Sequence, residues 1–414
     1  MNEKESVQTD EQSEIVPEEM PYMRVGISFY KLVDVPTIRG NSIRKRMPWS
    51  YSTIKVDHGN DYASHVPKYD GFTTLPSHTN FQRIVAGKFY NLYEPITHIP
   101  HKGKFPHIQM LVRHIFDEQF DMGMDYLQLL YLYPERKLPM LLLVSSERGT
   151  GKTTWLNFIK LIFQGNVTFN TNDEFRAKFN GDWAGMLVIM VDEVLLNKRD
   201  DTERLKCLST AQSIKIEEKG KDKFPVPFFA KFILCSNNEN LPVIIDPEEN
   251  RYWVRKVNHL DIDDTHFLEK LEAEIPAFLH FLQNRELSTK EESRMWFAPE
   301  LIATEALHKI MRCSRNKVEM DMHDLILHVM ESEGVDVVYF TPNDLLELLS
   351  VQDRSADRKQ VRRVLHESWQ LEPANNSLSY NTYQPDFSKP SRVGVCSRKG
   401  RYYTITRELI DRLR

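Results

Sequence analysis

Continuous apolar runs mark the middle of the chain. Three of them, PMLLLVSS from Pro139, GMLVIMVDE from Gly185 and AKFILCSNN from Ala230, lack the alternation of a half-exposed strand. Such runs are typical of strands in a parallel sheet that is covered on both faces. Segments with helical spacing lie between them, so the pattern predicts a domain of alternating strands and helices over residues 106–260.

The segments before this domain have other patterns. Residues 1–20 are acidic and polar, and we expect a disordered tail there. Residues 21–105 predict short strands and turns without a long helix, because prolines and glycines recur among them. From Pro106 to Pro134 the apolar spacing predicts two helices that break near Gly123.

Helical spacing also dominates residues 261–319. The last segment, residues 320–414, predicts helices followed by a β-hairpin around Lys399–Gly400. This order of elements suggests a small winged-helix-like domain. Its basic helix, DRKQVRRVLHESW, places cations at i, i+4 spacing, as the pairs Arg358 with Arg362 and Lys359 with Arg363. These cations either contact a DNA backbone or form a solvated face.

Composition is that of a soluble globular protein. The 414 residues suffice for two or three domains, and 41% are hydrophobic and 27% charged. No apolar run reaches the roughly 18 residues of a membrane span, and the N-terminus lacks the apolar core of a secretory signal. We therefore expect a cytoplasmic protein without a membrane partner.

Cysteine usage and charge narrow the chemistry. The four cysteines form no CxxC pair, which argues against a zinc site or disulfide framework and fits a reducing compartment. The net charge is −5, so contact with nucleic acid would require a local basic patch.

The segment SSERGTGKTTW, from Ser145 to Trp155, is close to the phosphate-loop pattern G-x-x-x-x-G-K-[ST]. It follows the first apolar run and opens a helical segment. Glycines let successive N–H groups face a phosphate, and the helix presents its positive end there. Ser146 stands where the pattern has a glycine. The plainer alternative is a glycine-rich turn before a core helix.

We expect this loop to bind ATP. Lys152 would reach the β- and γ-phosphates, and the Thr153 hydroxyl would bind Mg²⁺. The predicted nucleotide contacts are Glu147, Arg148, Gly149, Thr150, Gly151, Lys152, Thr153 and Thr154.

Polar residues end the other two apolar runs. Asp192 is expected to hold Mg²⁺, and Glu193 to orient and deprotonate the attacking water. A carboxylate pair beside a phosphate loop argues for hydrolysis rather than binding alone. Asn237, after the third run, would sense the γ-phosphate, or it is an asparagine in a turn.

Between the second and third runs, IKIEEKGKDKFPVPF predicts two strands and a turn. Lys219, Lys221 and Lys223 cluster at its tip. Such a basic hairpin either is solvated or grips a phosphodiester backbone.

Four elements in this order, SERGTGKTT, VIMVDE, EEKGKDK and FILCSNNENLP, resemble a superfamily 3 helicase of the AAA+ class, found in viruses, phages and plasmids. YNLYEP and EENRYWVRKV, which flank them, resemble the phage primase-helicase subgroup. The resemblance covers roughly residues 85–260. It implies an α/β fold with a P-loop AAA+-type parallel-sheet core, ATP and Mg²⁺ as cofactors, and a homo-hexameric ring that moves 3′ to 5′ along single-stranded DNA.

The resemblance also implies roles by position. Lys152, Asp192, Glu193 and Asn237 would be catalytic, and Lys219, Lys221 and Lys223 would hold DNA in the pore. Arg251 falls where the family places an arginine that completes the neighbouring subunit's site. Arg255 is the second candidate, and a structural salt bridge is the plainer alternative for either. NRYW stands where close relatives often carry paired arginines.

The leading hypothesis is therefore an ATP-dependent DNA helicase for phage or plasmid DNA replication, in the host cytoplasm if phage-encoded. A separate primase or polymerase is a candidate partner. The roughly hundred N-terminal residues are too few for a full primase domain. The alternatives are a P-loop ATPase that packages DNA or remodels protein, and a nucleotide-dependent DNA-binding initiator. The first needs no lysine hairpin, and the second needs no Glu193.

Overall fold

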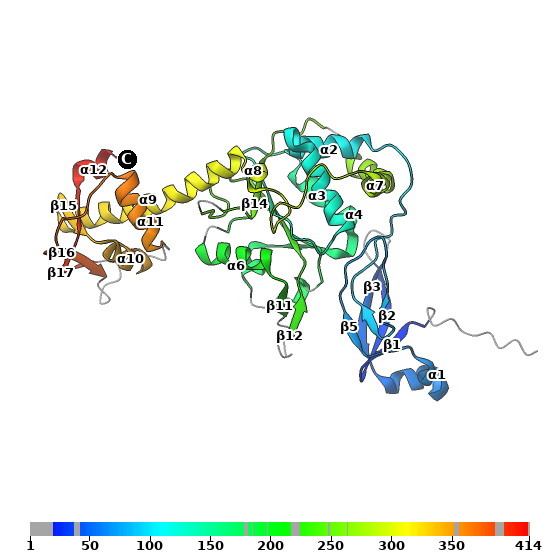
Figure 1. The fold of residues 1–414 in the computed structure, drawn as a ribbon. Helices are drawn as coiled ribbons and strands as arrows, with labels where there is room; N and C mark the ends of the chain where they lie inside the picture. The colour runs from blue at the N-terminus through cyan, green and yellow to red at the C-terminus, as the bar shows by residue number, and fades with distance from the viewer. Residues whose placement is uncertain are drawn as a thin grey trace, which may run out of the picture. The chain divides into compact units, whose positions relative to one another are not determined.

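The computed structural model describes residues 20–36, 42–177, 181–183, 185–196, 198–216, 224–246, 249–262, 264–351, 356–385 and 393–412. Two compact units make up the chain, Met1–Pro95 and Ile96–Arg414 (Figure 1). Of the acidic tail predicted over residues 1–20, all but Met20 lies outside the described residues.

The N-terminal unit contains two sheets and one helix. A four-stranded sheet has the order β3-β2-β1-β4, and a three-stranded sheet has the order β5-β7-β6. The elements are β1 (Tyr22–Val25), β2 (Ser28–Pro36), β3 (Ser42–Trp49), α1 (Tyr51–His65), β4 (Lys68–Tyr69), β5 (Gly71–Thr73), β6 (Ile84–Val85) and β7 (Phe89–Asn91). Tyr22 packs with Ile54 of α1, and Met23 packs with Tyr90 of β7, so the larger sheet has a core on each face.

This unit is more regular than predicted. β2 and β3 are longer than the expected short strands, and the expectation of no long helix is wrong because α1 spans 15 residues. α1 buries only Ile54 and Ala63, and Gly59 interrupts it with a φ of 89°. Because α1 has few buried positions and an internal break, its sequence shows little of the apolar periodicity by which a helix is predicted.

The second unit is built on a five-stranded sheet with the order β14-β8-β13-β10-β9. The strands are β8 (Met140–Val144), β9 (Val167–Asn170), β10 (Val188–Val191), β13 (Lys231–Ser236) and β14 (Tyr252–Lys256). Every neighbouring pair is parallel, which confirms the prediction of a parallel sheet. Because β13 lies between β8 and β10, the carboxyl ends of these three strands are adjacent.

Helices cover both faces of this sheet, as the apolar runs predicted. On one face, Phe116 stacks on Trp253 with ring centroids 4.7 Å apart and meets Trp155 edge-on. Figure 1 shows α2, α3, α4 and α7 together beside the sheet. On the other face, Leu142 and Leu234 share a cluster with Leu205 and Ile310.

The helices of this region are α2 (Pro106–Phe116), η2 (Asp117–Gln119), α3 (Phe120–Leu132), α4 (Lys152–Phe163), η3 (Gln164–Asn166), α5 (Asn172–Arg176), η4 (Gly181–Trp183), α6 (Arg199–Thr210), α7 (Phe267–Asn284), α8 (Pro299–Ile302) and α9 (Glu305–Glu333). α9 is continuous past residue 319, where the sequence pattern placed a boundary.

The break between α2 and α3 is not at Gly123. The chain turns at Asp117, whose φ is 43°, and Gly123 lies inside α3. A Cβ added at Gly123 would be 2.3 Å from Cδ2 of Phe116. This glycine therefore lets α3 approach Phe116, and a lone glycine in a helical pattern has packing as an alternative to a break.

The predicted basic hairpin is described at its two strands. β11 (Ser213–Ile216) pairs antiparallel with β12 (Phe224–Pro227), which confirms both strands. Lys219, Lys221 and Lys223 at the tip lie outside the described residues.

The C-terminal region has its own apolar cluster, which includes Phe340, Leu365 and Ile405. After α9 its elements are β15 (Val337–Phe340), α10 (Pro342–Val351), α11 (Arg358–Arg363), η5 (Val364–Ser368, a π turn), β16 (Leu378–Pro385), β17 (Val393–Gly400), β18 (Tyr403–Thr406) and α12 (Arg407–Arg412). No helix in the described part of the chain is both long and apolar enough to cross a membrane.

The predicted hairpin around Lys399–Gly400 is wrong. β17 pairs with β16, so that Gly400 is opposite Leu378, and β18 pairs with β15. The Lys-Gly dipeptide ends a strand instead of turning it back. Turn chemistry alone could not show that each strand has a better partner elsewhere in the sequence.

Candidate active site

The glycine loop, Ser145–Gly151, joins β8 to α4. Gly149 and Gly151 have φ values of 67° and 79°, in the left-handed region that favours glycine. A Cβ on Gly151 would be 2.8 Å from Leu260, and the Leu260 N–H donates to the Gly149 carbonyl at 3.0 Å. The loop conformation therefore depends on glycine both for its backbone angles and for packing against the chain that follows β14.

Lys152 and Thr153 begin α4 and point their polar groups into the same region. Lys152 is only 7% exposed, and its Nζ donates to Thr150 Oγ1 at 2.9 Å. Burial lowers the pKa of Lys152, while the nearby Cys235, Asp192 and Glu239 oppose that shift. Thr153 Oγ1 donates to Asp192 Oδ2 at 3.0 Å, which joins the loop to the end of β10.

Asp192 and Glu193 differ in their surroundings. Asp192 Oδ1 accepts the Glu193 N–H at 3.0 Å, and Glu193 itself is exposed. Glu193 has a φ of 55°, a strained conformation for a non-glycine residue. Asn172 of α5 braces it by donating to its carbonyl oxygen at 3.1 Å. Glu193 lies two residues after β10, at the carboxyl edge of the sheet.

The remaining predicted contacts lie at the end of β13, on the glycine loop and in the first turn of α4. Asn237 is exposed at the end of β13, between the strands that carry the loop and Asp192. Glu147 and Arg148 are exposed on the loop, and Thr154 is half-buried in the first turn of α4.

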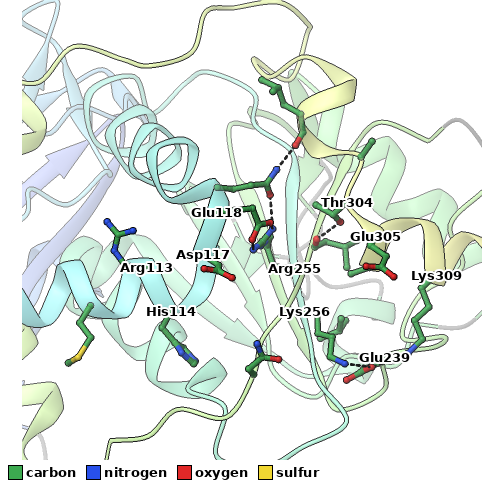
Figure 2. A pocket seen from close by; sticks show the side chains of 18 of the residues that line it. Arg113, His114, Asp117, Glu118, Glu239, Arg255, Lys256, Thr304, Glu305 and Lys309 are labelled. Atoms are coloured by element: carbon green, nitrogen blue, oxygen red, sulfur yellow. Dashed lines mark hydrogen bonds and ion pairs between the residues drawn. The ribbon is translucent and has the colours of Figure 1, made fainter.

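Ser146 has a specific partner that sequence reasoning missed. Its N–H and its hydroxyl donate to Glu239 Oε1, at 2.8 and 3.0 Å. Lys309 of α9 donates to the other carboxylate oxygen at 3.0 Å, and Lys256 lies 3.4 Å from it. Figure 2 shows both lysines converging on Glu239. Serine at the glycine position thus connects the loop to β14 and α9.

Glu239 is ionised in this position. Burial disfavours its charge, but the hydrogen bonds from Lys309 and from the N–H and hydroxyl of Ser146, with the charge of Lys256, outweigh burial and lower its pKa to about 2. The sequence offered one indication that Glu239 belongs to the site, because it lies two residues after Asn237 in the loop that follows the same strand.

A cleft of about 1270 Å³ lies along β14 beside the glycine loop (Figure 2). Glu239, Lys256 and Lys309 form part of its lining, with His114 of α2. The His114 Nε2 lies 3.0 Å from the Thr150 carbonyl oxygen, a second contact to the loop that the sequence did not indicate.

The two candidate arginines are held differently. Arg255 is 6% exposed, and its guanidinium is bonded to Glu118, Gln119 and the Phe116 carbonyl. Arg251 is more accessible and bonds both carboxylate oxygens of Glu249, at 2.8 and 2.6 Å. It precedes β14, and five strand residues at about 3.3 Å each place it roughly 16 Å from the carboxyl edge. The structure therefore does not bring Arg251 to the glycine loop of its own chain.

The donor set fits Mg²⁺. A threonine hydroxyl and one carboxylate, Thr153 and Asp192, already lie in contact, and Mg²⁺ binds through one or two protein groups together with phosphates and water. Across the described ranges, no group of three or more His, Cys, Asp or Glu side chains is placed to hold a metal by itself.

The basic helix of the C-terminal region lines a separate groove of about 1300 Å³. Arg358, Lys359, Arg362 and Arg363 are all exposed there, and Lys399 shares the lining. Both interpretations of these cations, DNA contact and solvated face, remain compatible with this arrangement.

Comparisons with known proteins agree with the fold. A family model described as a family of unknown function, DUF5906, matches residues 143–255. The apo structure of the NrS-1 C-terminal region is similar at 17% sequence identity, covering 87% of this chain and 92% of that chain with a TM-score of 0.57. An A-form apo structure of that region covers 93% and 96%, at 16% identity and a TM-score of 0.54. No curated protein matches the chain. The shared feature is a mixed α/β fold.

Proposed function

We propose that this protein is an ATP-dependent DNA helicase of the superfamily 3 type that serves phage or plasmid DNA replication. The observation that carries the proposal is the 3.0 Å contact between Thr153 and Asp192, 39 residues apart. It unites a glycine loop, a helix start and a strand-end carboxylate at one edge of a parallel sheet. Ligands of open α/β sheets bind at this edge.

The proposed chemistry is attack of water on the γ-phosphate of ATP, which bonds the water oxygen to the γ-phosphorus, breaks the bond to the oxygen that bridges to the β-phosphate, and releases ADP and inorganic phosphate. Backbone N–H groups of the glycine loop and the Lys152 ammonium bind the phosphates, and the positive end of α4 adds to their attraction. When bound, Mg²⁺ would be held by Thr153 and Asp192 and would neutralise charge on the phosphates. Glu193 orients the water and takes its proton, and Asn237 contacts the γ-phosphate or the water.

We assign the arginine that completes the site to Arg251 of a neighbouring subunit. Because β14 separates Arg251 from the loop of its own chain by roughly 16 Å, the proposal has it act on the site of a neighbouring subunit in a ring. Arg255 is committed to Glu118 and Gln119 and is a structural residue in this proposal. To contact a phosphate, the Arg251 guanidinium must release the Glu249 carboxylate and bond to the γ-phosphate instead.

Single-stranded DNA is the proposed track, with Lys219, Lys221 and Lys223 on the hairpin between β11 and β12 as its contacts in a hexamer. The C-terminal region has helices followed by paired strands, which supports a winged-helix-like domain. Its exposed cations on α11 are candidates for a DNA contact.

The test measures ATP hydrolysis with and without single-stranded DNA, together with the mass of the assembly in the presence of ATP. Lys152→Ala should abolish hydrolysis, whereas Lys290→Ala, at an exposed loop position, should not change it. Alanine at Lys219, Lys221 and Lys223 should keep basal hydrolysis and lose its stimulation by DNA. Turnover retained in Lys152→Ala would refute the nucleotide site, and unwinding unaltered by the triple change would refute the DNA contact.

A further inference from the structure

The N-terminal unit carries a groove that the site above does not use. It measures about 690 Å³ and lies between the four-stranded sheet and the end of α1. Its lining includes two cations, Arg24 and Lys68, and three aromatic side chains, Phe29, Trp49 and Tyr51. No acid is among the described residues that line it.

Strand register places four of these side chains in one row. Lys68 of β4 is paired with Arg24 of β1. Arg24 is opposite Phe29 of β2, and Phe29 is opposite Trp49 of β3. Directly paired residues project from the same face of a sheet, so two cations are followed by two aromatic rings across neighbouring strands. At about 4.8 Å per strand the row is roughly 14 Å long.

The aromatic end of the row presents an accessible ring. Tyr51 is 43% exposed and stacks on Phe29 with ring centroids 5.1 Å apart. Lys55 and Lys31 place their ammonium groups 4.6 Å from the Tyr51 ring and 4.7 Å from the Trp49 ring. Aromatic rings bordered by cations are suited to unpaired bases, whose faces stack while the backbone phosphates meet the charges.

The cationic end lacks compensating acceptors. Neither Arg24 nor Lys68 forms an ion pair with any residue that the structure describes. Arg24 Nε and Trp49 Nε1 are enclosed and have no hydrogen-bond partner among the described residues. Because these two atoms are closed to solvent, they do not contact a ligand in the groove, and the half-buried Arg24 and the exposed Lys68 offer it their remaining donors.

Regional charge also favours a polyanion. Residues 20–95 contain ten Lys and Arg against five Asp and Glu, although the whole chain has a net charge of −5. Residues 1–19 of the same unit add seven Asp and Glu and one Lys, so the unit as a whole is not positive, but the segment that forms its sheets is. That segment attracts phosphate backbones.

We propose that this groove, hereafter the N-terminal groove, binds single-stranded nucleic acid. Unpaired bases stack on Tyr51 and Phe29, and phosphates lie against Arg24 and Lys68. A duplex hides the base faces that the rings require, and a free phosphate leaves the rings unused. The inference goes beyond the proposed ATP-driven activity, because the groove lies in the N-terminal unit and its binding of single strands does not require ATP.

The test uses the full chain with Lys219, Lys221 and Lys223 changed to alanine, so that binding at the proposed pore does not mask the groove. A fluorescein-labelled thymidine oligonucleotide of about 12 nucleotides is titrated without ATP and followed by anisotropy. Tyr51→Ala should weaken binding about tenfold, as loss of one stacked base does. Tyr51→Phe keeps the ring and should bind nearly as the parent does.

Changing both Arg24 and Lys68 to alanine should lower the slope of log K against log salt by about 1.4, the value for two single-strand phosphate contacts. Lys88→Ala, in the same unit but in the turn between β6 and β7, should leave the slope unaltered. Uridine and duplex oligonucleotides extend the test. Equal, Tyr51-dependent binding of uridine would support a groove that binds either kind of single strand, and preferred binding of a duplex that Tyr51→Ala weakens would overturn the proposal.

Location is tested independently by photo-cross-linking a 4-thiothymidine oligonucleotide to the protein with native Tyr51. The proposal predicts cross-links in the peptides that contain Phe29, Trp49 or Tyr51. It is refuted if those peptides carry none, or if Tyr51→Ala and the double variant bind as the parent does. Binding of an extended peptide that the oligonucleotide fails to displace would also refute it. Because Lys152→Ala leaves the groove intact, failure of the motor and failure of this site are separate outcomes.

Discussion

The core sheet and the N-terminal sheet gather polar chemistry in different ways. In the parallel core, Thr153, Asp192 and Asn237 follow the ends of separate strands and meet at one edge. In the N-terminal sheet, Lys68, Arg24, Phe29 and Trp49 sit within their strands and meet only because pairing aligns them. Residues that meet at the edge of a parallel sheet can be predicted from the sequence, because each follows the end of its own strand. Residues that form a row across strands can be predicted only when the strand register is known.

The two regions also differ in how their charges are satisfied. Around the glycine loop, Lys152 donates a hydrogen bond to Thr150. Glu239 accepts hydrogen bonds from Ser146 and Lys309, so internal contacts hold the site in place. In the N-terminal groove, Arg24 and Lys68 form no ion pair with any residue in the described part of the chain. The two sites share no residue, so they are separable by mutation.

The largest expected separation comes from Glu193→Gln. Removing a general base costs about 10² to 10⁴ in rate, so ATP hydrolysis should fall by at least a hundredfold while nucleotide binding persists. Binding of a thymidine oligonucleotide by the N-terminal groove should not change. Single-turnover hydrolysis and anisotropy measure the two effects, and Glu286→Gln, on the loop after α7, is the matched control. Hydrolysis at the parent rate would exclude Glu193 as the base.

Glu239→Gln is expected to have an intermediate effect. The substitution removes the negative charge that accepts a hydrogen bond from Lys309 and pairs with Lys256. A hydrogen bond to a charged group contributes about 1.5–3 kcal/mol to folding stability. The free energy of unfolding should fall by roughly that amount, and nucleotide affinity should fall with it because the loop loses its anchor. Chemical denaturation and nucleotide titration test both.

The acid dependence of this effect has a defined sign. The pKa of Glu239 is about 2 in the folded chain against an ordinary value of 4.5, so its stabilisation is present above pH 4.5. It is lost as pH falls from 4.5 toward 2, and the stability difference between the parent and Glu239→Gln should shrink over that interval. A difference that grew on acidification would contradict the ion pair.

Ser146→Ala should have the smallest effect. The alanine retains the N–H bond to Glu239 and removes only the hydroxyl bond, worth about 0.5–1.5 kcal/mol. Stability should fall by that amount and hydrolysis by a few-fold at most. Comparison with Ser146→Gly, which restores the usual residue of the loop pattern, separates the lost bond from loop flexibility. An effect as large as that of Glu239→Gln would mean that the hydroxyl, not the carboxylate, organises the loop.

Strong local patterns predicted the core well. Unbroken apolar runs placed β8, β10 and β13, and the strand–loop–helix order placed Lys152 and Thr153 at the start of α4. Weak local patterns failed, as in α1, which buries few side chains, and at Gly123, where a packing glycine resembled a break. Arg255 could not be understood from its neighbours in sequence, because its partners Glu118 and Gln119 come from the turn between α2 and α3.

The sequence by itself determined which strands are buried, which residues end them and where glycine is required. These properties follow from side-chain hydrophobicity and backbone sterics over a few neighbouring residues. Only the tertiary structure decided that β13 lies between β8 and β10, that Ser146 binds Glu239, and that cations and rings share a row in the N-terminal sheet. Strand order, register and long-range hydrogen bonds depend on how distant segments pack together, and no local spacing encodes that choice.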